Sequence, residues 1–223
     1  MYETLPQPVS LLVASFLTVF VALLPIVNPM GMAPIFLRLT AGTSSATRAT
    51  LARRIAVNGF FLMAASLLVG SYVLAFFGLT VPAVQVAGGL IVMAAGWRLL
   101  QGDDPEGRQQ PLASADEQAL LRRAFFPLTM PLTVGPGTMS VAVTLGSHGA
   151  ARHELLPLAI GALVAICGVA AAIYACYRYA ERVLRLLGES GTDTLMRLSA
   201  FILLCLGVQI LTNGLAALPW LAG

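Results

Sequence analysis

The sequence predicts an all-α, polytopic membrane protein that crosses the bilayer six times as two inverted repeats of three helices. Three observations favour this fold class. The 223 residues are 58% hydrophobic and only 10% charged, whereas a soluble domain carries about 25% charged residues. The apolar residues form long runs, and two of these runs are interrupted by proline and glycine. The arginines gather in alternate links between the runs.

The first apolar run extends from about residue 9 to residue 39. As one straight helix it would be about 46 Å long, which exceeds a hydrocarbon core of about 30 Å. It contains the stretch Asn28-Pro29-Met30-Gly31-Met32-Ala33-Pro34, in which proline removes a backbone donor and clashes with the preceding turn. We therefore expect this run to bend, break or re-enter the membrane at Asn28-Pro29. No basic residue precedes it, so it is interpreted as a membrane helix and not as a cleaved signal.

Five further runs have about the length that a membrane span needs, and they cover residues 55–77, 82–100, 124–146, 155–177 and 198–218. The fourth run carries the second interruption, at Gly135-Pro136-Gly137. The clearly soluble segment is 101–123, which is rich in Asp, Glu, Gln and Pro. We predict a single transmembrane domain over residues 1–223, with a first repeat over about 9–100, a cytoplasmic linker over 101–123 and a second repeat over about 124–218.

The arginines predict how the spans are oriented. The chain has no lysine, and twelve of its thirteen basic residues lie in or beside the links after the first, third and fifth spans; Arg152 is the exception. By the positive-inside rule those links are cytoplasmic, and both termini face outward. Three spans in each half is an odd number, so the second half is inserted upside down relative to the first. Such an inverted repeat is typical of secondary transporters.

The two breaks are the candidate substrate site. A broken helix in lipid leaves polar backbone groups unpaired unless protein, water or a ligand satisfies them. Half-helix N-termini suit a carboxylate, and the C-terminal ends suit a cation or an ammonium group. Two facing breaks would therefore suit a small zwitterion such as an amino acid. The alternative for either break is a plain proline kink. The candidate substrate-binding residues are Asn28, Pro29, Gly31, Thr133, Gly135, Pro136, Gly137, Thr138, Gln209 and Asn213.

Gln209 and Asn213 belong to this set because they lie four residues apart, on one face of the sixth span. They would face a cavity in the transporter interpretation. Hydrogen bonding between helices is the commoner use of such residues, and this alternative stays open.

Other classes of protein are disfavoured by what the spans lack. No Asp, Glu, Lys or His lies centrally in any of them, so a proton relay of carboxylates, a metal site and an acid–base pair have no candidates. There is no phosphate-binding loop, and the basic residues are too dispersed for nucleic acid. We expect no enzyme activity and no cofactor, while coupling to Na⁺ or H⁺ is open. The expected partners are a small-molecule substrate and the lipid bilayer.

Several motifs resemble the MarC family, whose members are also described as neutral amino-acid transporters of the NAAT type. They are Asn28-Pro-x-Gly-x-x-Pro-Ile-Phe36, Ala87-Gly-Gly-Leu-Ile91 ahead of Gly96-Trp-Arg98, Pro127-Leu-x-Met-Pro131 running into Gly135-Pro-Gly-Thr138, and Gly207-Val-Gln209 with Asn213-Gly214. The resemblance covers essentially the whole chain. It implies a six-span protein of a bacterial or archaeal inner membrane that transports glycine- or alanine-like amino acids, with the two breaks as its central site.

The sequence thus predicts an alternating-access carrier for small neutral amino acids. Two other interpretations are kept: an exporter of amino acids or other small metabolites, similar to the LysE-type exporters, and a membrane scaffold or sensor that transports nothing. The direction of transport and the oligomeric state are not encoded in any recognisable pattern.

Overall fold

The computed structural model describes residues 7–102, 121–147 and 155–218, and every regular element in these ranges is helical. The elements are α1 (Gln7–Val27), α2 (Pro29–Leu39), α3 (Ser45–Phe76), α4 (Val81–Leu100), η2 (Ala124–Thr133), α6 (Pro136–Gly146) and α7 (Leu155–Ala216). The predicted all-α membrane architecture is confirmed.

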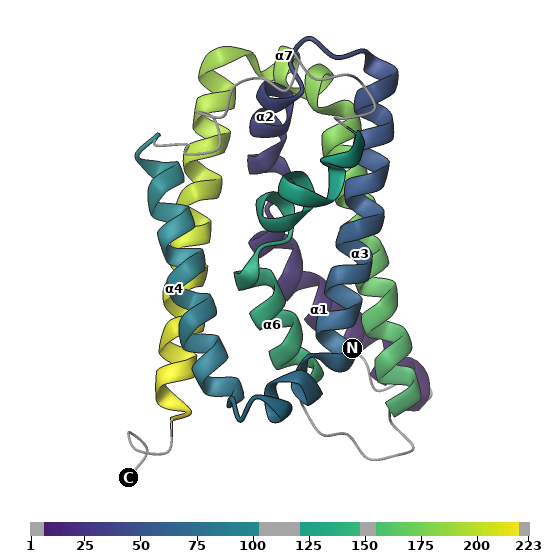
Figure 1. The fold of residues 1–223 in the computed structure, drawn as a ribbon, viewed down its shortest axis with the longest axis vertical. Helices are drawn as coiled ribbons and strands as arrows, with labels where there is room; N and C mark the ends of the chain where they lie inside the picture. Colours follow the sequence, from purple (N-terminus) through teal and green to yellow (C-terminus); the bar gives the residue numbers. More distant parts are fainter. Residues whose placement is uncertain (1–6, 103–120, 148–154, 219–223) are drawn as a thin grey trace.

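Helix α7 is a hairpin. Its 62 residues would be about 93 Å long as one straight helix, roughly three times the hydrocarbon core. The chain reverses at Gly188, whose φ of 66° lies in the left-handed region that glycine adopts without penalty. Figure 1 shows one arm, in green, beside α3 and the other, in yellow, beside α4. We call residues 155–187 the first arm and residues 189–216 the second arm, and each is long enough to cross the bilayer.

Both predicted breaks are present. The first span is divided into α1 and α2 at Asn28, and the fourth is divided into η2 and α6, which meet at 70°. With α3, α4 and the two arms of α7, these broken spans give six passes. The short helices α2 and α6 run in opposite directions from the middle of the bundle (Figure 1), as an inverted repeat requires.

The links between the spans differ from expectation in two places. The residues between the first and second predicted spans, 40–54, were expected to be a link, but α3 begins at Ser45 because the Ser44 side chain caps it, accepting a hydrogen bond from the Thr47 N–H at 3.1 Å. The Arg-rich link before residue 198 is helical on both sides of Gly188. The linker 101–123 lies mostly outside the described residues.

The second arm of α7 packs along α4, and the first arm packs against α1 and α3 (Figure 1). The contact with α4 is made by glycines seven residues apart on each helix, namely Gly89 and Gly96 on α4 with Gly207 and Gly214 on α7. A methyl group on Gly89 would lie 2.8 Å from the Cα of Leu211, and one on Gly214 would lie 2.8 Å from the N of Val86. Small residues let helix backbones approach closely in membranes, so these glycines set the distance between the two helices.

Replacing Gly207 with Ala should lower the stability of the protein. A methyl group there would collide with the backbone N and Cα of Met93, which cannot move aside without displacing α4. Such overpacking costs about 1–3 kcal/mol. Thermal unfolding in detergent would measure it, with Gly168→Ala as the control, because a methyl group on Gly168 meets no backbone atom and approaches the edge of the Phe20 ring at 3.1 Å. Equal melting temperatures for the two variants would contradict this packing.

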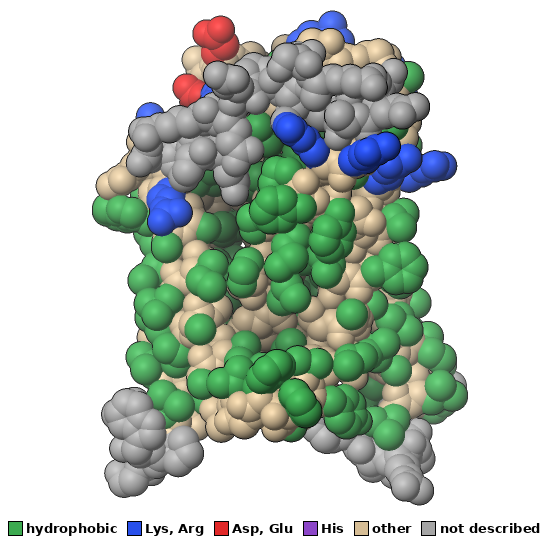
Figure 2. All heavy atoms as spheres, viewed as in Figure 1, with side chains coloured by type: hydrophobic (Ala, Val, Ile, Leu, Met, Phe, Trp, Pro, Cys, Tyr) green, Lys and Arg blue, Asp and Glu red, His purple; other side chains and the backbone are tan. Residues whose placement is uncertain are grey.

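The arginines of the described residues gather at one end of the bundle. This arginine-rich end is formed by the last turns of α2 and α4, the first turns of α3 and the turn at Gly188. Figure 2 shows the basic side chains at this end and apolar side chains over the middle of the visible face. Exposed large side chains such as Phe61, Tyr72 and Phe76 are in keeping with a surface that lies against lipid.

Candidate functional site

The break between α1 and α2 is built by Asn28 and Pro29. Asn28 adopts the left-handed conformation, with φ 47° and ψ 54°, which asparagine tolerates better than most residues. Its Oδ1 accepts a hydrogen bond from the Gly31 N–H at 3.1 Å and so caps α2. Pro29 occupies the first turn, where its missing N–H costs least. It has no N–H to donate to the Pro25 carbonyl, and the helix is therefore interrupted at this point.

The Asn28 side-chain amide is nearly buried, and only its oxygen atom has a hydrogen-bond partner among the described residues. The residue is 8% exposed, and its Nδ2 has no hydrogen-bond partner among the described residues. A buried amide group without a partner is unfavourable. Gly31 is required beneath it, since any side chain there would collide with the Asn28 amide. This break therefore holds a buried hydrogen-bond donor that has no partner among the described residues.

The second break is built by a repeated Pro-Leu-Thr triplet, Pro127-Leu128-Thr129 and Pro131-Leu132-Thr133. Each threonine hydroxyl donates to a carbonyl five residues earlier: Thr129 to Ala124 at 2.6 Å and Thr133 to Leu128 at 2.8 Å. These bonds satisfy carbonyls along η2, where proline interrupts the regular backbone pattern. Gly135 then caps α6 without a side chain, with Pro136 in the first turn.

Thr133 also connects the second break to the core. Its hydroxyl lies 2.9 Å from the Tyr177 hydroxyl on the first arm of α7, and both residues are buried. The Tyr177 ring stacks on Phe36 of α2, with centroids 4.5 Å apart. These contacts link one element of each break, α2 and η2, through the first arm of α7.

A cavity of about 460 Å³ lies where the two breaks meet. Six of the ten predicted residues line it: Asn28, Thr133, Gly135, Pro136, Gly137 and Thr138. The other wall comes from α4, with Ile91, Val92, Ala94, Ala95 and Arg98. The cavity is bordered by the N-termini of both α2 and α6, so the partial positive charges of two helix ends converge on it.

The remaining four predicted residues do not line this cavity. Pro29 borders a neighbouring apolar cavity of about 370 Å³, and Gly31 lies under the Asn28 side chain. Gln209 and Asn213 are exposed on the second arm of α7, where the Gln209 Nε2 donates to the Asn213 Oδ1 at 2.8 Å. The structure does not bring these two residues to the breaks.

Two contributors to the site were missing from the sequence prediction. Arg98 is an exposed residue in the last turn of α4 and is the only charged residue lining the cavity among the described residues. Thr129 supports η2 and accepts a hydrogen bond from the Asn58 Nδ2 at 3.5 Å. The Pro-Leu-Thr repeat was the available signal for Thr129.

The chain is similar to proteins of one membrane family. Residues 13–218 match the model of the MarC family, described as "MarC family integral membrane protein". The inner membrane protein MarC of Salmonella typhimurium is 33% identical over 202 residues, which cover 87% of this chain and 90% of that protein. The proteins of the same name from Citrobacter koseri and Escherichia coli are each 32% identical, with 87% of this chain covered and 90% and 91% of those proteins. No solved structure matches this chain.

Proposed function

Because this chain belongs to the MarC family of integral membrane proteins, we propose that it is an inner-membrane carrier that moves small neutral amino acids by alternating access. The observation that carries the proposal is the meeting of two broken helices, one from each half of the chain, at one cavity whose lining includes Asn28, Thr133 and Thr138. Broken helices at corresponding positions of two inverted repeats are a recurrent design of secondary transporters. The cavity volume falls in the range of about 300–1,000 Å³ that small-molecule sites occupy.

The chemistry of the cavity suits an amino acid. The N-terminal ends of α2 and α6 and the unpartnered Asn28 Nδ2 offer donors to a carboxylate. The C-terminal ends of α1 and η2 offer carbonyl oxygens to an ammonium group. No acidic side chain of the described residues lines the cavity, so repulsion of the substrate carboxylate is avoided. Apolar neighbours such as Val92 and Leu132 leave room for a small uncharged side chain.

We place the arginine-rich end in the cytoplasm and both termini outside. The positive-inside rule supports this orientation, because the arginines of the described residues gather at one end of the bundle. In this orientation Arg98 stands at the cytoplasmic side of the cavity.

Replacing Arg98 with Gln should raise the KM for transport from the cytoplasmic side about fivefold, as expected for an exposed charge worth about 1 kcal/mol. Arg98 lines the cavity, and its positive charge would draw the substrate carboxylate toward the helix N-termini. Rates would be measured in vesicles of known orientation. Arg38→Gln is the matched control, because Arg38 is also exposed in the last turn of a helix at the same end but does not line the cavity. Equal effects of both substitutions would contradict the role of Arg98.

Uptake and counterflow in proteoliposomes test the proposed function. Labelled glycine, alanine and serine would be compared with a labelled sugar, while Na⁺ and pH gradients are varied independently. Saturable, stereoselective flux of the amino acids is expected, and its dependence on each gradient would identify the coupling ion. An absence of amino-acid flux in folded, inserted protein would contradict the proposal and would favour an exporter of other metabolites or a scaffold.

A further inference from the structure

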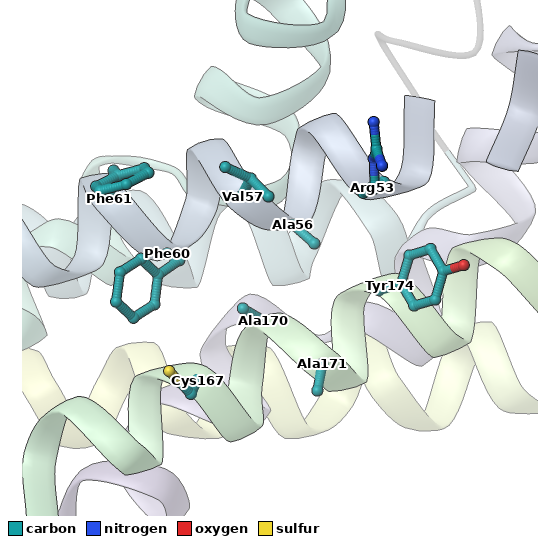
Figure 3. Close-up of a pocket in the computed structure, with 9 residues that line it drawn as sticks. All are labelled: Arg53, Ala56, Val57, Phe60, Phe61, Cys167, Ala170, Ala171 and Tyr174. Carbon is teal, nitrogen blue, oxygen red and sulfur yellow. The ribbon is translucent and has the colours of Figure 1, made fainter. Parts of the chain in front are cut away.

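A groove of about 500 Å³ runs along the outer surface of the bundle. It shares no lining residue with the cavity at the two breaks. Its walls are α3 and the first arm of α7 (Figure 3). The wall from α3 is formed by Ala56, Val57, Phe60 and Phe61, and the wall from α7 by Cys167, Ala170, Ala171 and Tyr174. Alanines on both helices keep the groove open, and nearly all of its surface is apolar.

One end of the groove carries a positive charge. Figure 3 shows Arg53 and Tyr174 at the same end, with the Tyr174 hydroxyl directed toward that end, while Phe60 and Phe61 lie toward the other. No hydrogen bond or ion pair to Arg53 exists among the described residues. The nearby arginines of α3 do have partners: Arg48 pairs with Glu181 at 3.0 Å, and Arg54 donates a hydrogen bond to the Leu121 carbonyl at 3.1 Å.

The depth of Arg53 matches that of a lipid headgroup. From Arg53 to the end of α3 at Phe76 the helix is about 35 Å long, close to the thickness of a hydrocarbon core of about 30 Å. Arg53 therefore stands at the boundary between the headgroups and the acyl chains. Tyrosine is enriched at the same level of membrane proteins. The apolar part of the groove then lies alongside the acyl chains.

We propose that this groove binds an anionic phospholipid, with one acyl chain between α3 and the first arm of α7 and the headgroup phosphate on the Arg53 guanidinium and the Tyr174 hydroxyl. Basic pockets between membrane helices are suited to such headgroups. The inference rests on the membrane topology alone and not on the proposed transport function.

A second copy of the chain fits the groove less well. Two copies that insert in the same orientation place the same residues at the same depth in a symmetric interface. Arg53 would then face a surface that carries arginine at its own level, and like charges in contact are unfavourable. No acidic side chain of the described residues lines the groove to compensate.

Native mass spectrometry of the detergent-purified, delipidated protein tests the proposal. Phosphatidylglycerol and phosphatidylcholine with identical acyl chains would be added to the wild type and to three variants. Arg53→Gln removes the headgroup contact, and Ala171→Phe fills an exposed position in the groove without changing the charge. Arg185→Gln is the matched control, because it removes an exposed arginine near the same end that does not line the groove.

The wild type should retain phosphatidylglycerol in preference to phosphatidylcholine. Arg53→Gln should weaken phosphatidylglycerol binding about fivefold, Ala171→Phe should reduce the binding of both lipids, and Arg185→Gln should leave binding unchanged. Equal retention by the Arg53→Gln and Arg185→Gln variants would overturn the proposal. A dimer of the wild type that Ala171→Phe dissociates would also overturn it, because the occupant would then be a second copy.

Discussion

Replacing Asn28 with Asp should reduce amino-acid transport by roughly 10- to 100-fold while the protein still folds and inserts. The carboxylate keeps an oxygen for the Gly31 N–H, and Asp is as good an N-cap as Asn. The substitution removes the unpartnered Nδ2 donor and places a negative charge where the substrate carboxylate would lie. A hydrogen bond to a charged group is worth about 1.5–3 kcal/mol, from which the expected loss follows. Counterflow of labelled alanine in proteoliposomes would measure it.

Two further substitutions make the Asn28 result specific. Asn28→Leu removes the helix cap as well as the donor, so we expect it to abolish transport and also to lower stability by about 1 kcal/mol. Asn213→Leu is the matched control, since Asn213 is exposed and bonds to Gln209 instead of lining the cavity. Wild-type counterflow in the Asn28→Asp variant, or an equal loss in the Asn213→Leu variant, would refute the assignment of Asn28.

Replacing Gly135 with Leu should abolish transport. Gly135 has φ −88° and ψ 176°, an extended backbone that any residue adopts, so its role is to leave space. A Cβ there would meet only the Pro131 carbonyl oxygen, at 3.1 Å, and the rest of a leucine side chain would extend into the cavity that Gly135 lines. We expect normal levels in the membrane and no saturable uptake.

The size of the residue at position 135 provides the control. Gly135→Ala adds one methyl group that the Pro131 carbonyl can accommodate with a small shift, and we expect it to keep a measurable fraction of the transport rate. Uptake by the Gly135→Leu variant at the wild-type rate would show that the cavity is not the route of the substrate. A failure of Gly135→Leu to reach the membrane would be distinguished from blocked transport by quantifying the protein in the same vesicles.

The breaks could be predicted from the sequence because their cause is local. Pro29 and Pro136 remove donors within apolar runs, and in lipid no water replaces the lost hydrogen bonds. Six of the predicted residues meet at one cavity for the same reason, because each break lies near the middle of its span. The extent of α3 was harder to foresee, since Ser44 starts the helix well before the apolar run begins.

The rest of the candidate site depends on the orientation of each helix about its own axis, which decides the face that is directed toward the cavity. The spacing of Gln209 and Asn213 places them on one face, but which face looks inward is decided by the glycine contacts between α4 and α7. Those contacts direct the pair to the exposed surface and bring the wall of α4 that includes Arg98 to the cavity. The contact between Thr133 and Tyr177 joins residues 44 positions apart, and no periodic pattern in one sequence encodes such a pairing.

Occupation of the cavity between the two breaks by substrate is tested by protection of a thiol introduced at Ala95. Ala95 lines the cavity from α4 and belongs to neither break. The Ala95→Cys variant would be made after Cys167, Cys176 and Cys205 are replaced by Ser, and its alkylation by a maleimide would be timed with increasing alanine. We predict that alanine slows alkylation with the same half-saturation as counterflow. Alkylation unaffected by alanine, in protein that performs counterflow, would show that the substrate does not occupy this cavity.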